Sequence, residues 1–246
     1  HLIRRLQPTI VFNSTIKMNV YGGFCCWLLG VPFANNISGL GTSFIHDSWL
    51  FRRVRQLYGM VNRRARHLFF ENEEDLEVFR SSGMLGDTPY TLLPGSGVDL
   101  QHFSPSPLPS GNTVIFLMMA RLLGDKGVRE YATAASLLKE QGVNARCLLL
   151  GQLGVSNRTA ITEEEVAVWQ SEGLIEYLGE TDDVRPYIQR ADTLVLPSYR
   201  EGMPRTVLEA AAMGRPAIVT DVPGCRHAIE PGVTGWLCEA RNSESL

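Results

Sequence analysis

The sequence predicts an α/β protein with two domains, each built on a parallel sheet that helices cover on both faces. Short apolar runs alternate with longer stretches of helical period, and the runs are continuous, which is typical of strands buried on both faces. With 246 residues the chain is longer than one domain usually is. A segment rich in proline and serine, 102–112, predicts a linker. We therefore expect a first domain at 1–105, a linker at 106–112 and a second domain at 113–246.

The individual elements follow from composition and periodicity. Strands are expected at 9–13, 67–71, 90–93, 113–119, 146–150, 174–178, 193–196 and 217–220. Helices are expected at 18–29, 49–64, 72–82, 127–141, 162–172, 183–190, 204–213 and 225–230. Their alternation predicts repeated strand–helix units and hence parallel strands.

Composition and charge exclude several classes of protein. The net charge is −3, but residues 1–70 carry nine Lys/Arg against one acid, which leaves +8 there and −11 in the remainder. The basic part is expected to meet an anionic partner. Five cysteines, with no C-x-x-C pair, indicate buried thiols in a reducing compartment rather than disulfides or a zinc site. The longest apolar run, 24–33, is too short to span a bilayer, and we find no signal peptide.

Charged residues follow two predicted strands of the second domain. Arg121 and Lys126 lie in "ARLLGDKG" (120–127), and Glu201 lies in "LPSYREGMP" (196–204). Ligands of open α/β sheets bind at the carboxyl ends of the strands, so these side chains are expected at one edge. Two cations beside a helix N-terminus favour an anion, and a diphosphate suits such a site.

Two glutamates, Glu201 and Glu209, stand on either side of a predicted helix start. Pro204 suits the first helical position, where its missing N–H costs nothing. Glu209 then lies more than a turn inside the helix, near Arg205 and Thr206. Because carboxylates accept hydroxyl hydrogens, sugars on both sides of a bound diphosphate would match. The pattern predicts a nucleotide-sugar site.

Several segments in the same order resemble the retaining glycosyltransferases of family 4, which have the GT-B fold of two Rossmann-like domains. The matching motifs are "EGMPRTVLE" (201–209), "ARLLGDKGVREYATAA" (120–135), "LPGSGVD" (93–99) and "TIKMNVYGG…NNISGLGTSF" (15–44). The branch that the chain resembles builds lipid-linked oligosaccharides, as bacterial N-acetylhexosaminyltransferases acting on undecaprenyl diphosphate sugars do. The resemblance runs over nearly the whole sequence.

The resemblance implies a role for each matching residue. Arg121 and Lys126 would hold the donor diphosphate, and Glu201 would hold the transferred sugar and support charge at its anomeric centre. Glu209 would hold the ribose, and the segment Leu178–Asp183 would lie near the base. The donor-binding set is Gly202, Met203, Pro204, Arg205, Thr206, Val207, Glu209, Gly179 and Asp183, and the acceptor-side set is Lys17, Gly39, Gly41 and His46.

The implied reaction moves a sugar, an N-acetylhexosamine, from a UDP-sugar to a lipid-linked saccharide with retention of anomeric configuration. It belongs to the synthesis of cell-surface polysaccharide or glycan and needs no cofactor and no metal ion. "ETDD" (180–183) resembles an acidic metal motif, but a helix N-cap by Asp182 or Asp183 is the stronger interpretation. His67 begins a predicted strand, which indicates a structural role.

An arginine-rich segment, 50–66, carries an apolar stripe on one side and arginines on the other. Because the expected acceptor is an anionic lipid, we expect this helix to contact an anionic membrane surface. The protein would then be cytoplasmic and peripheral at the inner face of the cell membrane. Nucleic acid is disfavoured as a partner because the whole chain is acidic.

Two departures from the family pattern leave alternatives open. The sequence enters after the first strand and glycine-rich loop that such enzymes usually have, and it stops before their closing helix. We therefore expect an incomplete first domain and a second domain without its closing helix. The alternatives are an enzyme of the UDP-N-acetylglucosamine epimerase type and an inactive fragment that binds nucleotide sugar.

Overall fold

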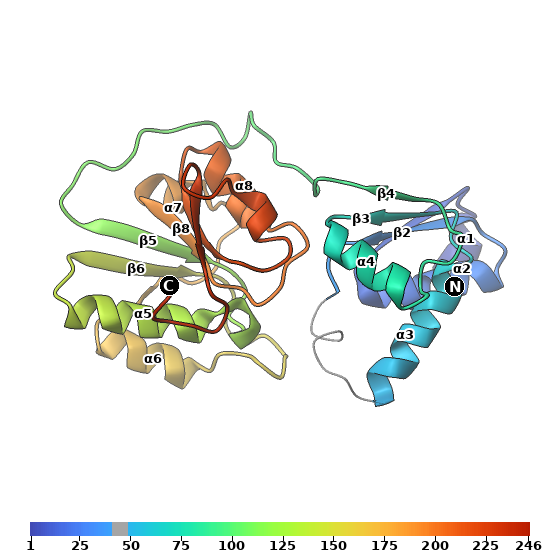
Figure 1. Cartoon of the computed structure of the whole chain (residues 1–246), viewed down its shortest axis with the longest axis horizontal. Coiled ribbons are helices and arrows are strands. Elements are labelled where there is room, and N and C mark those ends of the chain that lie inside the picture. Colours follow the sequence, from blue (N-terminus) through green and yellow to red (C-terminus); the bar gives the residue numbers. More distant parts are fainter. Residues whose placement is uncertain (41–48) are drawn as a thin grey trace. The chain divides into compact units, whose positions relative to one another are not determined.

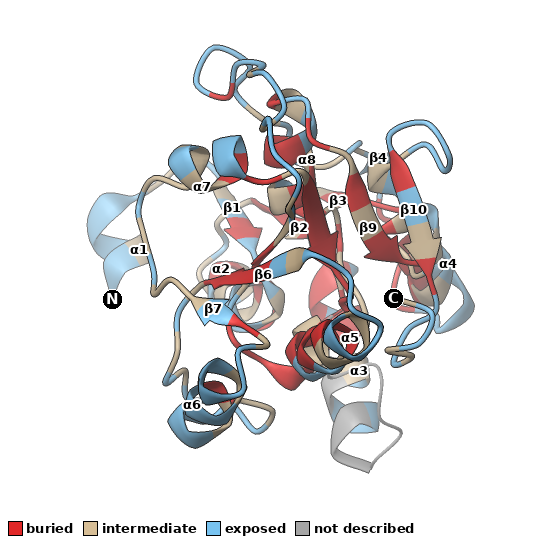
Figure 2. Ribbon diagram, turned by 90° about the vertical axis from the view of Figure 1, so that its left-hand side faces the viewer, coloured by how far each residue is buried: buried red, intermediate tan, exposed pale blue. Residues whose placement is uncertain are grey.

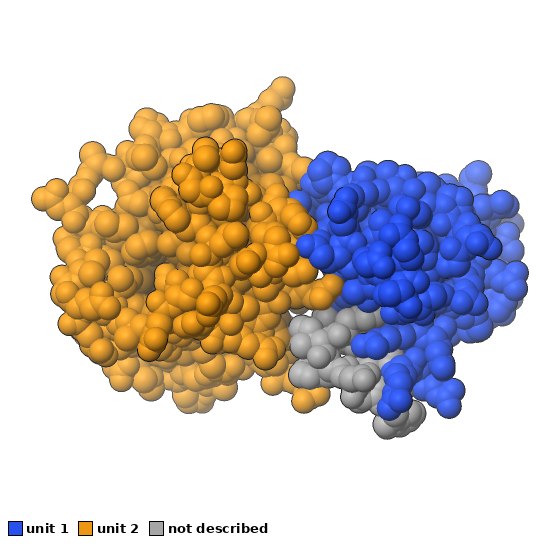
Figure 3. All heavy atoms as spheres, viewed as in Figure 1, with its two compact units in different colours: residues 1–96, 201–203 blue, residues 97–200, 204–246 orange. Residues whose placement is uncertain are grey.

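The chain forms two units, each with its own parallel sheet, in a computed structural model that describes residues 1–40 and 49–246. The side chains of residues 49–51 and 54 lie outside that description. Unit 1 comprises residues 1–96 with 201–203, and unit 2 comprises residues 97–200 with 204–246 (Figure 3). The division falls before the expected linker at 106–112, because residues 97–112 pack with the second unit.

Unit 1 is a four-stranded sheet in the order β1-β2-β3-β4, with all neighbours parallel (Figure 1). Its strands are β1 (Val11–Ser14), β2 (Phe33–Ile37), β3 (His67–Phe70) and β4 (Tyr90–Leu92). Its helices are α1 (Leu2–Leu6), the π-helix η1 (Met18–Gly22), α2 (Gly23–Leu28), α3 (Trp49–Asn62) and α4 (Glu73–Ser81). Helix α4 begins where the Asn72 side chain accepts the Asp75 N–H at 2.8 Å, a normal N-cap.

The interior of unit 1 combines apolar packing with buried amides. Tyr58, Phe70 and Phe79 are fully buried and meet edge to face. Beside them, Asn13 of β1 donates to Asn35 of β2 at 2.9 Å, and Asn35 donates to the Asn62 side chain at the end of α3 at 2.8 Å. These three side chains, the amide chain, are buried.

Unit 2 is a six-stranded parallel sheet in the order β10-β9-β8-β5-β6-β7. Its strands are β5 (Val114–Met119), β6 (Ala145–Leu150), β7 (Glu176–Tyr177), β8 (Thr193–Leu196), β9 (Ala217–Thr220) and β10 (Gly235–Cys238). Its helices are α5 (Val128–Glu140), α6 (Glu163–Ser171), α7 (Arg185–Arg190) and α8 (Arg205–Ala212), with short 3₁₀ turns η3 (Gly124–Lys126) and η4 (Arg226–Ala228). This is the strand order of a doubly wound dinucleotide-binding fold.

The unit 2 sheet is buried on both faces by separate apolar clusters (Figure 2). Leu117, Leu194 and Val219 pack against the side that α7 and α8 cover. Met118 and Leu149 pack against the side that α5 and α6 cover. The predicted parallel sheet with helices on both faces is confirmed for this unit.

The start of unit 2 is held by one buried arginine. The Arg215 guanidinium donates to the carbonyl oxygens of Ser106 at 2.8 Å and Pro107 at 2.7 Å. It also donates to the carbonyls of Ile188 and Met213, at the ends of α7 and α8. Together with buried Phe103, these bonds fix the proline-rich segment to the second sheet.

Several predicted elements differ from those observed. Strands β2 and β10 and helix α1 were not predicted, and the expected helix at 225–230 is only the 3₁₀ turn η4. Pro204 is the N-cap of α8, with an extended ψ of 107°, and is not its first helical residue. Cys25 is exposed, so the prediction that all five thiols are buried is wrong for that residue. None of the described helices is long and apolar enough to cross a membrane.

Candidate functional site

The candidate site lies at the carboxyl edge of the unit 2 sheet. Strand β5 is central, with β8 on one side and β6 on the other, and the strand order reverses there. The chain leaves β5 into residues 120–127 and leaves β8 into the loop before α8. Such a reversal point is where open α/β sheets bind ligands.

Glycines let the loops after neighbouring strands approach closely. Gly127 has φ 76°, and a Cβ there would collide with the Pro197 carbonyl oxygen. Gly151, after β6, has φ 150°, and a Cβ there would collide with the Ala120 carbonyl oxygen. Both positions require glycine for the backbone conformation and for the space.

Hydrogen bonds join the loop after β5 to the loop after β8. The Tyr199 N–H donates to the Asp125 carbonyl at 3.0 Å, and the Ser198 hydroxyl donates to the same oxygen at 3.3 Å. The Tyr199 hydroxyl donates to Glu130 Oε1, on α5, at 2.5 Å. Burial and this carboxylate raise the pKa of Tyr199 to about 12. The backbone that carries Lys126 is therefore fixed against the backbone that leads to α8.

The two predicted cations lie on this fixed frame. Arg121 follows β5 directly and is exposed, and Lys126 ends the turn η3 and is partly exposed. Both belong to the loop after the central strand, next to the loop that precedes α8. The structure therefore brings Arg121 and Lys126 to the sheet edge that sequence analysis assigned to them.

Helix α8 contributes its N-terminus and a buried carboxylate. The first N–H groups of any α-helix lack partners inside the helix, and here Pro204 provides no side-chain cap. Glu209 is only 8% exposed and accepts from the largely exposed Arg205 Nη2 at 3.3 Å. Burial raises the pKa of the Glu209 carboxyl, opposed by Arg205 and, more weakly, by His102. Thr206 is partly exposed and Val207 is buried on the same helix.

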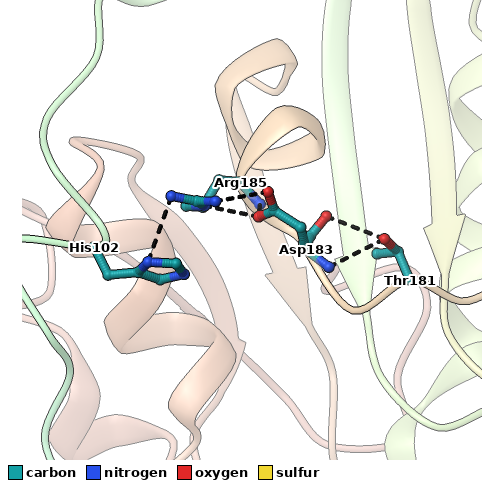
Figure 4. Close-up of polar contacts among 4 residues, drawn as sticks. All are labelled: His102, Thr181, Asp183 and Arg185. Atoms are coloured by element: carbon teal, nitrogen blue, oxygen red, sulfur yellow. Dashed lines mark hydrogen bonds and ion pairs between the residues drawn. The ribbon is translucent and has the colours of Figure 1, made fainter.

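The segment after β7 forms another part of the edge. Gly179 has φ 77° with open space where a Cβ would stand, and its carbonyl accepts the Gly151 N–H at 2.8 Å. Asp183 binds Arg185 through both carboxylate oxygens, at 2.7 and 2.8 Å, and accepts its backbone N–H (Figure 4). The bonds from Arg185 lower the pKa of the Asp183 carboxyl to about 2. Asp183 thus anchors the start of α7, but the prediction that Asp182 or Asp183 is its N-cap is wrong, because the N-cap is Val184.

The acceptor-side residues belong to unit 1. Lys17 is exposed after β1, and Gly39, with φ 109°, follows β2, so both lie at the carboxyl ends of adjacent strands. Gly41 and His46 lie outside the described residues. Glu201, Gly202 and Met203 are grouped with unit 1. His67 begins β3, as predicted, and its ring bonds the Thr91 hydroxyl of β4 at 2.9 Å.

Sequence reasoning missed four residues that shape this edge, namely Tyr199, Glu130, His102 and Arg185. Tyr199 and Glu130 lie 69 residues apart in the chain, and His102 and Arg185 lie 83 apart. No short motif connects either pair, so neither contact could be found without the sheet order. Among the described residues, no group of three His, Cys, Asp or Glu side chains could hold a metal ion.

The arrangement favours a phosphorylated, hydroxylated ligand. Two cations and a helix N-terminus attract phosphate, while a buried carboxylate can accept hydrogen bonds from hydroxyl groups. A Cβ at Gly179 would meet no other atom within 4 Å. The edge therefore combines groups that bind phosphate with a carboxylate that accepts from hydroxyl groups.

Comparisons with known proteins agree with this chemistry. The family model for glycosyl transferases group 1 matches residues 113–246. A Campylobacter jejuni protein, N,N'-diacetylbacillosaminyl-diphospho-undecaprenol alpha-1,3-N-acetylgalactosaminyltransferase, is 28% identical over 262 residues, covering 100% of this chain and 67% of that protein. The UDP-Gal:alpha-D-GlcNAc-diphosphoundecaprenol alpha-1,3-galactosyltransferase of Escherichia coli is 24% identical, with coverages of 100% and 66%. The chain thus spans about two thirds of the length of these relatives.

Solved structures share the fold at low sequence identity. Sucrose-phosphate synthase from Thermosynechococcus elongatus has a TM-score of 0.80 at 18% identity, over 99% of this chain and 64% of that one. Anabaena Alr3699/HepE, solved in complex with UDP, has a TM-score of 0.77 at 19% identity, over 99% and 68%. These matches confirm the predicted fold of two Rossmann-like units of the GT-B type.

Proposed function

The chain belongs to the glycosyl transferases group 1 family, and from that premise we propose that it transfers a sugar from a UDP-sugar to a lipid-linked saccharide. The sugar would be an N-acetylhexosamine, the anomeric configuration would be retained, and the product would enter cell-surface polysaccharide or glycan synthesis. The observation that carries the proposal is the grouping of Arg121, Lys126, the α8 N-terminus and buried Glu209 at one sheet edge.

In this proposal the donor diphosphate lies on the loop after β5. Arg121 and Lys126 neutralise its charge, and the N–H groups at the start of α8, from Arg205 to Val207, hydrogen-bond its oxygens. The acceptor hydroxyl oxygen bonds the anomeric carbon from the face at which the bond to UDP breaks, and its proton passes to the departing diphosphate, so no protein nucleophile is required. Preorganised positive charge at the leaving group is usually the largest single contribution to catalysis.

The two glutamates bind different parts of the donor. Glu209, held by Arg205 and buried in α8, accepts hydroxyl hydrogens of the ribose. Glu201, in the loop before α8, holds the transferred sugar and supports the charge that develops at its anomeric centre. The backbone of Gly202, Met203 and Pro204 completes the sugar subsite, and the segment 178–183 takes the base.

The acceptor would meet residues of unit 1, with Lys17, Gly39, Gly41 and His46 on its side of the reaction. The names of both relatives describe acceptors linked through diphosphate to undecaprenol. We extend that acceptor class to this chain.

The cations of unit 2 supply the charge that a metal ion would otherwise supply, so we expect full activity in the presence of a chelator and without a cofactor.

Contact with the membrane is proposed for α3. Arg52, Arg55, Arg63 and Arg64 line a groove of about 670 Å³ beside this helix, together with Ser82–Met84, and no acidic residue lines it among those described. A groove of this charge favours anionic headgroups, and the protein would lie at the inner face of the cell membrane. Co-sedimentation with phosphatidylglycerol vesicles tests this contact. Binding that does not change with salt concentration or with anionic lipid content would contradict the proposal.

The decisive test of the donor site is calorimetric titration of the chain with UDP, beside NAD. We expect UDP to bind, NAD to give no heat, and Lys126→Ala to weaken UDP binding at least about tenfold. Lys139→Ala is the matched control, because Lys139 lies in the last turn of α5 and bonds the Glu172 carbonyl at 2.6 Å. If both variants bind UDP as tightly as the wild type does, Lys126 is not part of the donor site.

Product analysis separates transfer from the alternative epimerase chemistry. Incubation with UDP-N-acetylglucosamine and a lipid-linked saccharide should give an extended saccharide whose new linkage keeps the donor configuration. Interconversion of the nucleotide sugar without an acceptor would favour the epimerase. Binding of UDP without either product would indicate the inactive nucleotide-sugar-binding fragment.

A further inference from the structure

His102 lies beside the Asp183–Arg185 pair although no motif placed it there (Figure 4). Its backbone is fixed by a turn in which Asp99 Oδ1 accepts the N–H groups of Gln101 at 2.9 Å and His102 at 3.2 Å. The next residue, Phe103, is buried in the unit 2 core. The imidazole itself is exposed, and its ring meets the Phe103 ring edge to face with 5.0 Å between the centroids, so the turn and this contact together fix its position.

The contact with Arg185 determines which ring nitrogen of His102 carries a proton. Arg185 Nη1 lies 3.4 Å from His102 Nδ1, while its other two nitrogens bind the Asp183 carboxylate. A guanidinium can only donate, so Nδ1 must accept, and the neutral ring then carries its proton on Nε2. His102 is thereby a hydrogen-bond donor of fixed orientation.

The contact with Arg185 also places the His102 ring at the end of the proposed base segment. Arg185 holds both carboxylate oxygens of Asp183, the last residue of that segment, while its third nitrogen lies 3.4 Å from His102 Nδ1. Bonds from Arg185 lower the pKa of the Asp183 carboxyl. The imidazole is therefore next to the segment that we propose for the base.

The ion pair beside His102 does not need the imidazole for its own stability. Asp183 already receives two side-chain bonds and one backbone bond from Arg185, and its N–H donates to the Thr181 hydroxyl at 3.1 Å. An exposed ring that adds one long contact to a complete pair contributes little to folding. The Nε2–H group of His102 is therefore available to bind a ligand.

We propose that His102, oriented by Arg185, reads the nucleobase of the donor by donating its Nε2–H to a base carbonyl oxygen. This rests on the proposed function, because it assumes that a nucleotide occupies the edge. A uracil offers two carbonyl acceptors, whereas adenine has no carbonyl: its acceptors are ring nitrogens at other positions, and N1 and N7 lie beside an amino donor. His102 is therefore a specificity-determining residue that favours uridine nucleotides over adenosine nucleotides.

The experiment compares UDP and ADP binding, by calorimetry, to the 246-residue chain and three variants. His102→Phe keeps a ring but removes the donor, and His102→Gln restores an N–H donor near the position of Nε2. Gln101→Ala is the matched control in the same turn, because only its backbone bonds Asp99. We expect His102→Phe to weaken UDP binding about three- to tenfold and ADP binding less than about twofold. His102→Gln should recover most of the UDP preference, and Gln101→Ala should match the wild type.

The outcomes are distinguishable. A wild-type chain that binds no UDP overturns the proposed function and this inference with it. A wild-type chain that prefers UDP, with the same preference in His102→Phe, overturns the inference alone. Thermal unfolding of the variants checks folding, and a Tm within about 2 °C of the wild type is expected because the ring is exposed.

Discussion

Both sheets of this chain pack apolar side chains against their helices, but among the described residues only unit 1 adds a chain of buried amides. In unit 1 the strands β1 and β2 meet through the buried amides of Asn13 and Asn35, which continue to Asn62 of α3. In unit 2 the strands β5, β6 and β8 meet their helices through apolar side chains on both faces. Buried amides are favourable only when every partner is in place, whereas apolar packing tolerates small shifts. The stability of unit 1 therefore depends on the alignment of these amides as well as on its apolar core, whereas the stability of unit 2 depends mainly on apolar packing.

The largest effect is expected from placing an amide in the apolar sheet. Leu149→Asn, in β6, should lower the free energy of unfolding of unit 2 by about 4 kcal/mol, because it loses apolar burial and leaves an amide without a partner. Hydrogen exchange read by mass spectrometry would locate the loss in unit 2. A loss shared equally by both units would contradict the separate cores.

Replacing a buried amide of unit 1 by an apolar side chain should lower the free energy of unfolding by less, and the loss should fall on unit 1. Asn35→Leu removes the central amide and leaves Asn13 and Asn62 each short of a bond, for an expected cost of about 3 kcal/mol in unit 1. Urea unfolding, with exchange to assign the unit, measures it. Phe12→Leu is the control, because Phe12 is on the neighbouring strand but 69% exposed. Unchanged stability of Asn35→Leu would mean that the amides add nothing beyond their volume.

Glu209 is an exception within unit 2, because it is a buried carboxylate for which we propose a role in function and not in stability. Burial raises the pKa of Glu209 above its ordinary 4.5, so the folded chain holds that proton more tightly than the unfolded chain does. Its stabilising contribution is complete below pH 4.5 and is lost as pH rises through the raised pKa. Glu209→Gln should therefore be more stable than the wild type at pH 7, by about 1 kcal/mol, and not at pH 4.

Urea unfolding of both proteins at pH 4, 5.5 and 7 checks the sign of the Glu209 effect. The same variant should bind UDP more weakly, because it lacks the carboxylate that we propose to accept ribose hydroxyl hydrogens. A stability gain that grows as pH falls would show that the folded carboxylate is stabilised by Arg205 more than burial penalises it.

The smallest effect is expected in the chemical labelling of thiols, which tests their exposure without a change in the free energy of unfolding. Cys25 of unit 1 is exposed, whereas Cys147 and Cys238 of unit 2 are buried, which raises the pKa of each to about 11. At pH 8 only about 0.1% of such thiols would be ionised, and the thiolate is the reactive form. Iodoacetamide should label Cys25 and spare the other two, as peptide mass mapping would show. Labelling of Cys147 before Cys25 would contradict the packing of β6.

The difference between the units also explains what the sequence could predict. The apolar strands β5, β6, β8 and β9 and the helices between them were predicted correctly, because their buried side chains are mainly apolar and follow strand or helix periodicity. Strand β2 was missed because "FANNI" contains asparagines that pair within the sheet, which no local propensity indicates. The family and the fold were predicted from separate motifs, and both are confirmed.

The candidate site was only partly predictable, for a physical reason. Arg121, Lys126 and Glu209 were found because they lie within a few residues of a strand end or helix start. The Tyr199–Glu130 and His102–Arg185 contacts depend on which strands are neighbours and on how residues 97–103 return to the second sheet. Pro204 was placed one position too far into α8, because proline fixes φ but leaves ψ free to be extended.

The close passage of the loop after β5 against the loop after β8 limits how the site can change over generations or in the laboratory. Because Gly127 leaves no room before the Pro197 carbonyl, an insertion or a bulkier residue in one loop would displace the other. A change of donor preference would therefore require residues 120–127 and 197–200 to be replaced together by the two loops of one relative. Chimeras that swap a single loop should fail more often than chimeras that swap both.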